Sequence, residues 1–148
     1  MANYNGVNIG KALFFIITNN TSINATNLLD NDASLVQPAP MRSENDPALG
    51  VTYEIDSITN VDIKRPYYET PPVNISTVRL EVFAKDYSTG TNLATTIIGE
   101  LITTAVPATY NNVKIERITI DNVKQDFNTK SRRYVWTLFL DITTYNQN

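Results

Sequence analysis

Cysteine and histidine are both absent from the 148-residue sequence, and each absence removes whole classes of chemistry. Without cysteine there is no disulfide framework, no thiolate nucleophile and no zinc–thiolate site. Without histidine the commonest general base and the commonest metal ligand are missing, which excludes Ser-His-Asp, Cys-His and HExxH sites. An enzyme built on this chain would have to use carboxylates, lysine, tyrosine or a bound cofactor.

Long apolar runs are missing as well. The longest, Ala12 to Ile17, falls far short of the roughly 18 residues that a membrane span requires. No cationic stretch or small-residue cleavage site makes this run a signal peptide, so we expect no membrane association and no export. The net charge of −3 argues against broad electrostatic binding of nucleic acid.

One motif suggests a nucleotide site at first sight: the glycines and lysine of "NGVNIGKALFFII", residues 5–17. A Walker phosphate loop needs four residues between its glycines and a Ser or Thr after its lysine. Gly6 and Gly10 enclose three residues, and Ala12 follows Lys11. We therefore interpret the stretch as the entry to a packing helix, with Lys11 on the exposed side of that helix.

Two acidic patterns resemble binding or catalytic sites and have simpler explanations. The segment that starts at Asp30 has the first spacings of a calcium loop, but Leu35 and Met41 stand where Gly and Glu are required. Glu54 and Asp56 lie two apart on a predicted strand, which is typical of a polar outer face. The sequence therefore predicts no catalytic residue, no metal ligand and no cofactor.

Two helices are predicted from apolar residues at helical spacing. The first runs from residue 9 to about residue 19. The second follows "DYSTG", where Ser88 or Thr89 is the expected cap, and Pro107 ends it. The apolar stripe of the second helix consists of Leu93, Ile97, Leu101 and Ala105, widened by Ala94, Ile98 and Ile102.

Two-residue alternation predicts four strands, at residues 49–62, 76–85, 113–123 and 134–145. The order helix, loop, strand, strand, helix, strand, strand is typical of an α+β domain. We expect a single domain over residues 1–148. Its mainly antiparallel four-stranded sheet should have one long and one short helix packed on one face.

Two stretches between these elements are expected to be irregular: residues 19–48, rich in Asn, Asp and Ser, and the protruding Pro/Tyr loop at 64–73. On the last strand Val135 and Phe139 face away from Trp136, which is predicted to lie in the core. Exposed apolar surface on a chain without catalytic equipment indicates assembly. The candidate assembly contacts are Lys64, Arg65, Tyr67, Tyr68, Arg132, Arg133 and Phe139.

Nearly the whole chain resembles the tail-terminator, or tail-completion, proteins of long-tailed (siphovirus-type) bacteriophages. The closest match is "VRLEVFAKDYSTGTNLATTIIGEL", an alternating strand, a Lys-Asp-Tyr corner and an amphipathic helix. "NIGKALFFIITNNTSI" resembles the opening helix of the family, and "APMRSENDPALGVTYEIDSIT" its linker into a strand. "VKIERITIDNVKQDFNTKSRRYVWTLFLDITTY" resembles its closing hairpin.

This resemblance implies a non-enzymatic virion protein that forms a homo-oligomeric ring, typically a hexamer, at the head-proximal end of the tail. The ring would cap the tail tube protein, end its polymerisation and join the tail to head-completion or connector proteins. DNA would pass through the lumen without sequence-specific binding. Such a protein would be found in the virion, and in the host cytoplasm during assembly.

Two alternatives to a tail terminator stay open on the sequence. One is a head-completion or connector ring protein, which belongs to the same class. The other belongs to a different class and is a virion decoration or adhesin binding module.

Overall fold

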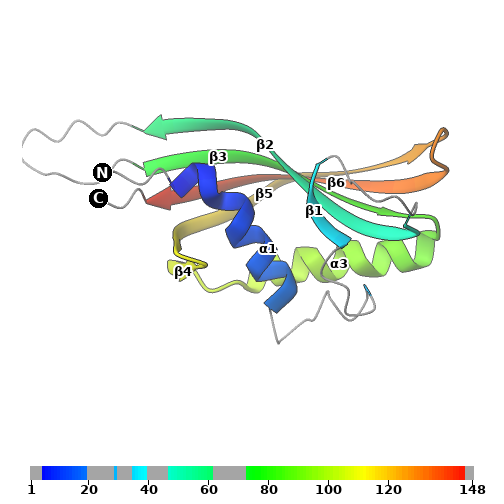
Figure 1. Ribbon diagram of the computed structural model, residues 1–148, viewed down its shortest axis with the longest axis horizontal. Coiled ribbons are helices and arrows are strands. Elements are labelled where there is room, and N and C mark those ends of the chain that lie inside the picture. Colours follow the sequence, from blue (N-terminus) through cyan, green and yellow to red (C-terminus); the bar gives the residue numbers. More distant parts are fainter. Residues whose placement is uncertain (1–4, 20–28, 30–34, 40–46, 62–72, 146–148) are drawn as a thin grey trace, which may run out of the picture.

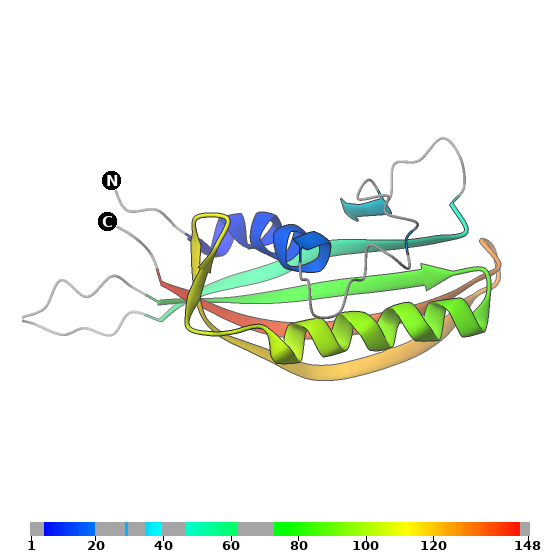
Figure 2. The same cartoon turned by 90° about the horizontal axis from the view of Figure 1, so that it is seen from below.

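The computed structural model describes residues 5–19, 29, 35–39, 47–61 and 73–145. Within them, two α-helices lie on one face of a curled, six-stranded sheet with the order β1-β2-β3-β6-β5-β4 (Figure 1 and Figure 2). In chain order the elements are the 3-10 helix η1 (Asn5–Asn8), α1 (Ile9–Asn19), β1 (Val36–Pro38), β2 (Leu49–Val61), β3 (Val73–Ala84), α3 (Tyr87–Thr103), β4 (Ala108–Tyr110), β5 (Val113–Asn128) and β6 (Arg133–Tyr145).

The predicted four-stranded, mainly antiparallel sheet is wrong, because the sheet has six strands and includes a parallel pair. β1 pairs in parallel with β2, with Val36 opposite Val51. β1 lies within residues 19–48, which are predicted from the sequence to be irregular. A strand of three residues that ends in Pro38 is too short to show alternation, so hydrophobic periodicity gives no sign of it.

β4 is the other strand that the sequence pattern misses. It forms a hairpin with β5, in which Tyr110 pairs with Val113 across Asn111 and Asn112. The φ angles of the two asparagines are 48° and 64°. Two left-handed residues in a two-residue loop are typical of a type I′ turn, and Asn tolerates this conformation. The Asn-Asn pair is a readable hairpin signal. Pro107 lies four residues before it, and the predicted helix end at Pro107 is wrong, because α3 ends at Thr103.

The longer elements agree with the sequence pattern. β5 continues to Asn128, whereas the sequence predicts that it ends at residue 123. β2 contains a register shift between Ile55 and Ser57, where its two-residue alternation changes phase. α1 has the predicted bounds, and its buried stripe contains Ile9, Leu13, Ile16 and Ile17.

α3 begins earlier and buries a narrower stripe than the sequence predicts. Its N-cap is Asp86 and not Ser88 or Thr89. The Asp86 carboxylate accepts hydrogen bonds from the Thr89 backbone N–H at 2.9 Å and from the Thr89 hydroxyl at 2.7 Å. At the other end, Ile102 is 69% exposed, so its expected place in the buried stripe is wrong.

The cap makes the stability of the protein depend on pH. The side-chain hydrogen bond from Thr89, followed by the backbone one, holds the pKa of Asp86 below its ordinary value of 3.8. Because the folded-state pKa is the lower one, this stabilisation is present above the unfolded-state pKa and is lost as pH falls through the folded-state pKa. Asp86→Asn keeps a capping side chain and removes the titrating group. We expect the variant to lose less stability than the wild type between pH of about 7 and about 3 in urea unfolding; equal losses would contradict this.

The core lies between the two helices and the central strands β3 and β6. Trp136 is 6% exposed, which confirms that it is a core residue. Each fully buried aliphatic side chain contributes about 1.5–3 kcal/mol to folding. The helix-facing aliphatic residues of the two strands that are fully shielded from solvent are Val78, Leu80, Val82, Leu138, Leu140 and Ile142. Among the described residues, no helix is long and apolar enough to span a membrane.

Candidate assembly surface

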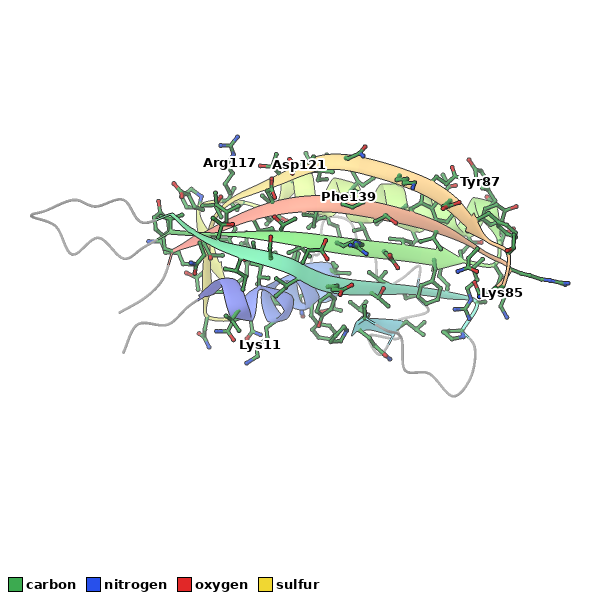
Figure 3. The ribbon with its side chains drawn as sticks, turned by 90° about the horizontal axis from the view of Figure 1, so that it is seen from above. Lys11, Lys85, Tyr87, Arg117, Asp121 and Phe139 are labelled. Carbon is green, nitrogen blue, oxygen red and sulfur yellow. The ribbon has the colours of Figure 1, made fainter. Side chains whose placement is uncertain are left out.

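In the part of the chain that the structure describes, both helices lie on one face of the sheet and leave the other uncovered; Figure 3 is viewed from the uncovered side. We call it the open face. Side chains on it alternate with the buried ones along each strand, as the burial pattern of β3 shows. Several of these side chains are half-buried, because neighbouring side chains of the open face cover one another. The open face contains Thr77, Arg79, Glu81, Phe83, Asn122, Lys124, Asp126, Arg133, Val135, Thr137, Phe139 and Asp141.

Charged and apolar side chains alternate around a groove of about 400 Å³ on the open face. Phe139 lines this groove and lies opposite Arg79 of β3 in the strand register. Arg79 also forms an ion pair with Asp56, with Nη2 and Oδ2 3.2 Å apart. Both side chains of this pair are partly exposed, so it contributes little to folding stability. The open face is therefore a surface of mixed polarity that no layer of the described chain covers.

Of the seven candidate assembly contacts predicted from the sequence, the structure describes three, and two of these lie on the open face. Arg133 and Phe139 lie on the open face, and Arg132 lies in the turn between β5 and β6 with a φ of 53°. The guanidinium carbon of Arg133 is 4.8 Å from the centroid of the Phe83 ring. Burial lowers the pKa of Arg133, but the group stays charged at neutral pH. The remaining candidates lie outside the described residues: Lys64, Arg65, Tyr67 and Tyr68.

Two carboxylates of the open face lie beside each other near the outer edge of the sheet. A hydrogen bond between Asp121 and Asp141 raises the pKa of Asp121 above its ordinary value. The Thr77 hydroxyl donates a further hydrogen bond to Oδ1 of Asp141 at 3.2 Å. In the described part of the chain, no group of three or more acidic residues is arranged to hold a metal ion. The pair is thus a local acidic feature of the edge, which Figure 3 shows at the labelled Asp121.

An aromatic cluster at the end of the β5–β6 hairpin is absent from the sequence interpretation. The Tyr134 ring centroid is 5.3 Å from that of Tyr87 and 4.9 Å from that of Phe127. Trp136 lies behind them, 5.8 Å from Tyr87. Tyr87 and Phe127 are 49% and 44% exposed, so the cluster reaches the surface. Phe127 lies beyond residue 123, where the sequence pattern ends the strand, so the pattern gives it no place on β5.

A second exposed apolar region lies where α1 and α3 end. Phe15 of α1 is 41% exposed and lines a groove of about 250 Å³ with Tyr110 of β4. Ile102 and Val106 are further exposed apolar side chains of this part of the chain. None of the residues that line the groove carries a charge. Exposed apolar surface of this kind is typical of a region that contacts a partner.

Comparison with known proteins is informative at the level of the fold. No protein-family model matches the chain, and no curated protein matches it. Its fold is similar to that of a chain in a solved structure described as the virion of a native gene transfer agent particle, with a TM-score of 0.70 and 10% sequence identity. The match covers 97% of this chain and 99% of that chain. At this identity the likeness establishes a shared fold over nearly all of both chains.

Proposed function

We propose that the chain is a structural, non-enzymatic protein of a phage-like virion. The observation that carries this proposal is the fold that it shares, over 97% of its length, with a chain of a gene transfer agent virion. The absence of cysteine and histidine from the sequence supports a structural role, because it excludes the commonest catalytic arrangements. The open face and the exposed aromatic cluster offer surfaces for contacts with other virion proteins.

Within that class, we propose that the protein is a tail terminator. It forms a homo-oligomeric ring, with six copies as the expected number, that caps the tail tube and joins it to head-completion or connector proteins. The resemblance of the sequence to tail-terminator proteins supports this assignment. The curled sheet supports it too, since a curved subunit with uncovered edges is suited to closed rotational symmetry.

Purified protein tests the proposal directly. Negative-stain micrographs and sedimentation should show rings, and rings mixed with tail tubes should cap the tubes at one end and stop their growth. A protein that stays monomeric at all concentrations and never binds tubes would contradict the proposal. Rings that bind head-completion proteins but not tubes would assign the protein to a connector instead.

A further inference from the structure

The sheet has two long edges at which the described residues supply no neighbouring strand. β4 pairs with β5 only at residues 113–115, so the outer edge of β5 is open over residues 116–128. β1 pairs with β2 only at residues 51–53, so the outer edge of β2 is open over residues 54–61. Such edges present backbone N–H and C=O groups that can pair with a strand of another chain.

The directions of the strands determine which pairings a ring allows. β2, β3, β6 and β5 are neighbours in this order, and each is antiparallel to the next. The two outer strands of this set therefore run in opposite directions. Copies related by a rotation axis all run the same way along it, so β5 of one copy meets β2 of the next as an antiparallel strand. A contact between two different edges closes into a ring when the rotation closes.

The apolar side chains of the two edges lie on the same side of the sheet. Ile58 of β2 is opposite Ser76, which is buried on the helix-covered face. Val123 of β5 is opposite Leu138, which is buried on that same face, and Phe127 lies four residues further along. These three exposed side chains are 38%, 43% and 44% exposed. A continuous sheet would place them side by side on the helix-covered face and would remove apolar surface from water.

The charged side chains of the two edges favour pairing between unlike edges. In residues 54–61 the charged side chains are Glu54 and Asp56. The open-face side of β5 carries both signs, with Arg117 and Lys124 beside Asp121 and Asp126, and Figure 3 shows Arg117 projecting from the outer edge. Pairing β2 with a second β2 would oppose carboxylates only, whereas pairing β2 with β5 offers two cations to the carboxylates of β2.

We propose that a second copy of this chain occupies each edge, so that residues 116–128 of one subunit pair antiparallel with residues 54–61 of the next and the sheet runs on around the ring. This inference rests on the ring of the proposed function and names the contact that builds it. The short strands β1 and β4 pair with residues 51–53 of β2 and 113–115 of β5, and they thereby limit the registers in which the subunits can join.

The absence of cysteine makes disulfide cross-linking a direct test. Directly opposed residues in an antiparallel pair have Cα atoms about 4.5–5.5 Å apart, within the roughly 4.4–6.8 Å that a disulfide spans. Thr59→Cys on β2 is combined, one at a time, with a cysteine on the open-face side of β5. We expect at least one combination to give covalent multimers up to a closed ring on a non-reducing gel. The β5 substitutions are Arg117→Cys, Thr119→Cys, Asn122→Cys, Lys124→Cys and Asp126→Cys.

Matched controls test whether cross-linking requires two cysteines on the same face of the joined sheet. Gln125→Cys combined with Thr59→Cys should not cross-link, because Gln125 lies opposite Trp136 on the helix-covered face. Each single-cysteine variant should stay monomeric on the gel, and a mixture of the Thr59→Cys and Lys124→Cys single variants should give no product larger than a dimer.

The outcomes separate this inference from the proposed function. If micrographs show rings but no open-face pair of cysteines cross-links, the edge contact is overturned while the ring stands. A dimer formed by a single β5 cysteine variant would reveal two-fold pairing of β5 with β5, which also overturns the contact. If the unmodified protein forms no ring at all, the proposed function fails, and the edge contact fails with it.

Discussion

Replacing Gly90 with alanine is expected to destabilise the fold, although alanine favours helices more than glycine does. Gly90 lies in the first turn of α3, against the buried ring of Trp136. An added Cβ would lie 2.3 Å and 2.5 Å from the ring atoms Cζ3 and Cη2 of Trp136, and 2.8 Å from Cβ of Ala84. Real Cβ atoms essentially never make contacts below 3.0 Å, so the helix or the ring must move. Overpacking of this kind costs about 1–3 kcal/mol or more, which exceeds the about 1 kcal/mol of helix propensity gained.

Urea unfolding of Gly90→Ala measures this loss. Asn92→Ala, at an exposed position of the same helix, is the matched control and should be neutral or slightly stabilising. In the Gly90→Ala background, Trp136→Phe removes the clashing part of the ring. It should therefore cost less stability there than in the wild type, and a double-mutant cycle detects the difference. A Gly90→Ala protein as stable as the wild type would show that the contact relaxes without cost.

The contact between Gly90 and Trp136 illustrates what the sequence can and cannot predict. The bounds of α1 and the core position of Trp136 follow from local periodicity, which adjacent residues determine. The need for glycine at position 90 cannot be read from its neighbours, because it arises from Trp136 on a strand far along the chain. The strand β1 is not predictable for the same reason, because three residues form a strand only when a neighbouring strand is in place. β4 differs, since its turn at Asn111 and Asn112 is a local signal. The number of strands in the sheet is therefore in part a tertiary property.

The candidate assembly surface was likewise predictable only in part from the sequence. Alternation along the last strand placed Phe139 opposite the core, and the structure puts it on the open face. The partner of Arg133 was not predictable, since Phe83 comes from a strand distant in sequence. The open edges depend on strand order, which no single segment encodes. Val123 was readable as a strand residue, but its exposure follows from its position on the outer strand.

Leu138 and Phe139 are neighbours on β6 that point to opposite faces, so truncating each to alanine is expected to separate folding from assembly. Leu138 is fully buried between the sheet and the helices. Leu138→Ala should lower the free energy of unfolding by about 2–5 kcal/mol, because it removes buried surface and leaves a cavity. Phe139 is half-buried and lines the groove on the open face. Phe139→Ala should cost about 1 kcal/mol, since its ring is only partly removed from water in the subunit.

The effects of the two variants on binding to tail tubes should be reversed: Phe139→Ala should weaken this binding, and Leu138→Ala should leave it unchanged. If subunits join at their edges, the open face stays available in the ring, and we expect Phe139 to contact a further virion protein there. Phe139→Ala should then still form rings but bind tail tubes at least about tenfold more weakly, as truncation of an aromatic interface residue typically does. Leu138→Ala rings, once folded at low temperature, should bind tubes as the wild type does. Sedimentation of rings with tubes measures both affinities. Undiminished binding by Phe139→Ala would remove Phe139 from the assembly contacts. It would shift attention to the two other exposed apolar regions described, the aromatic cluster around Tyr87 and the uncharged groove beside Phe15.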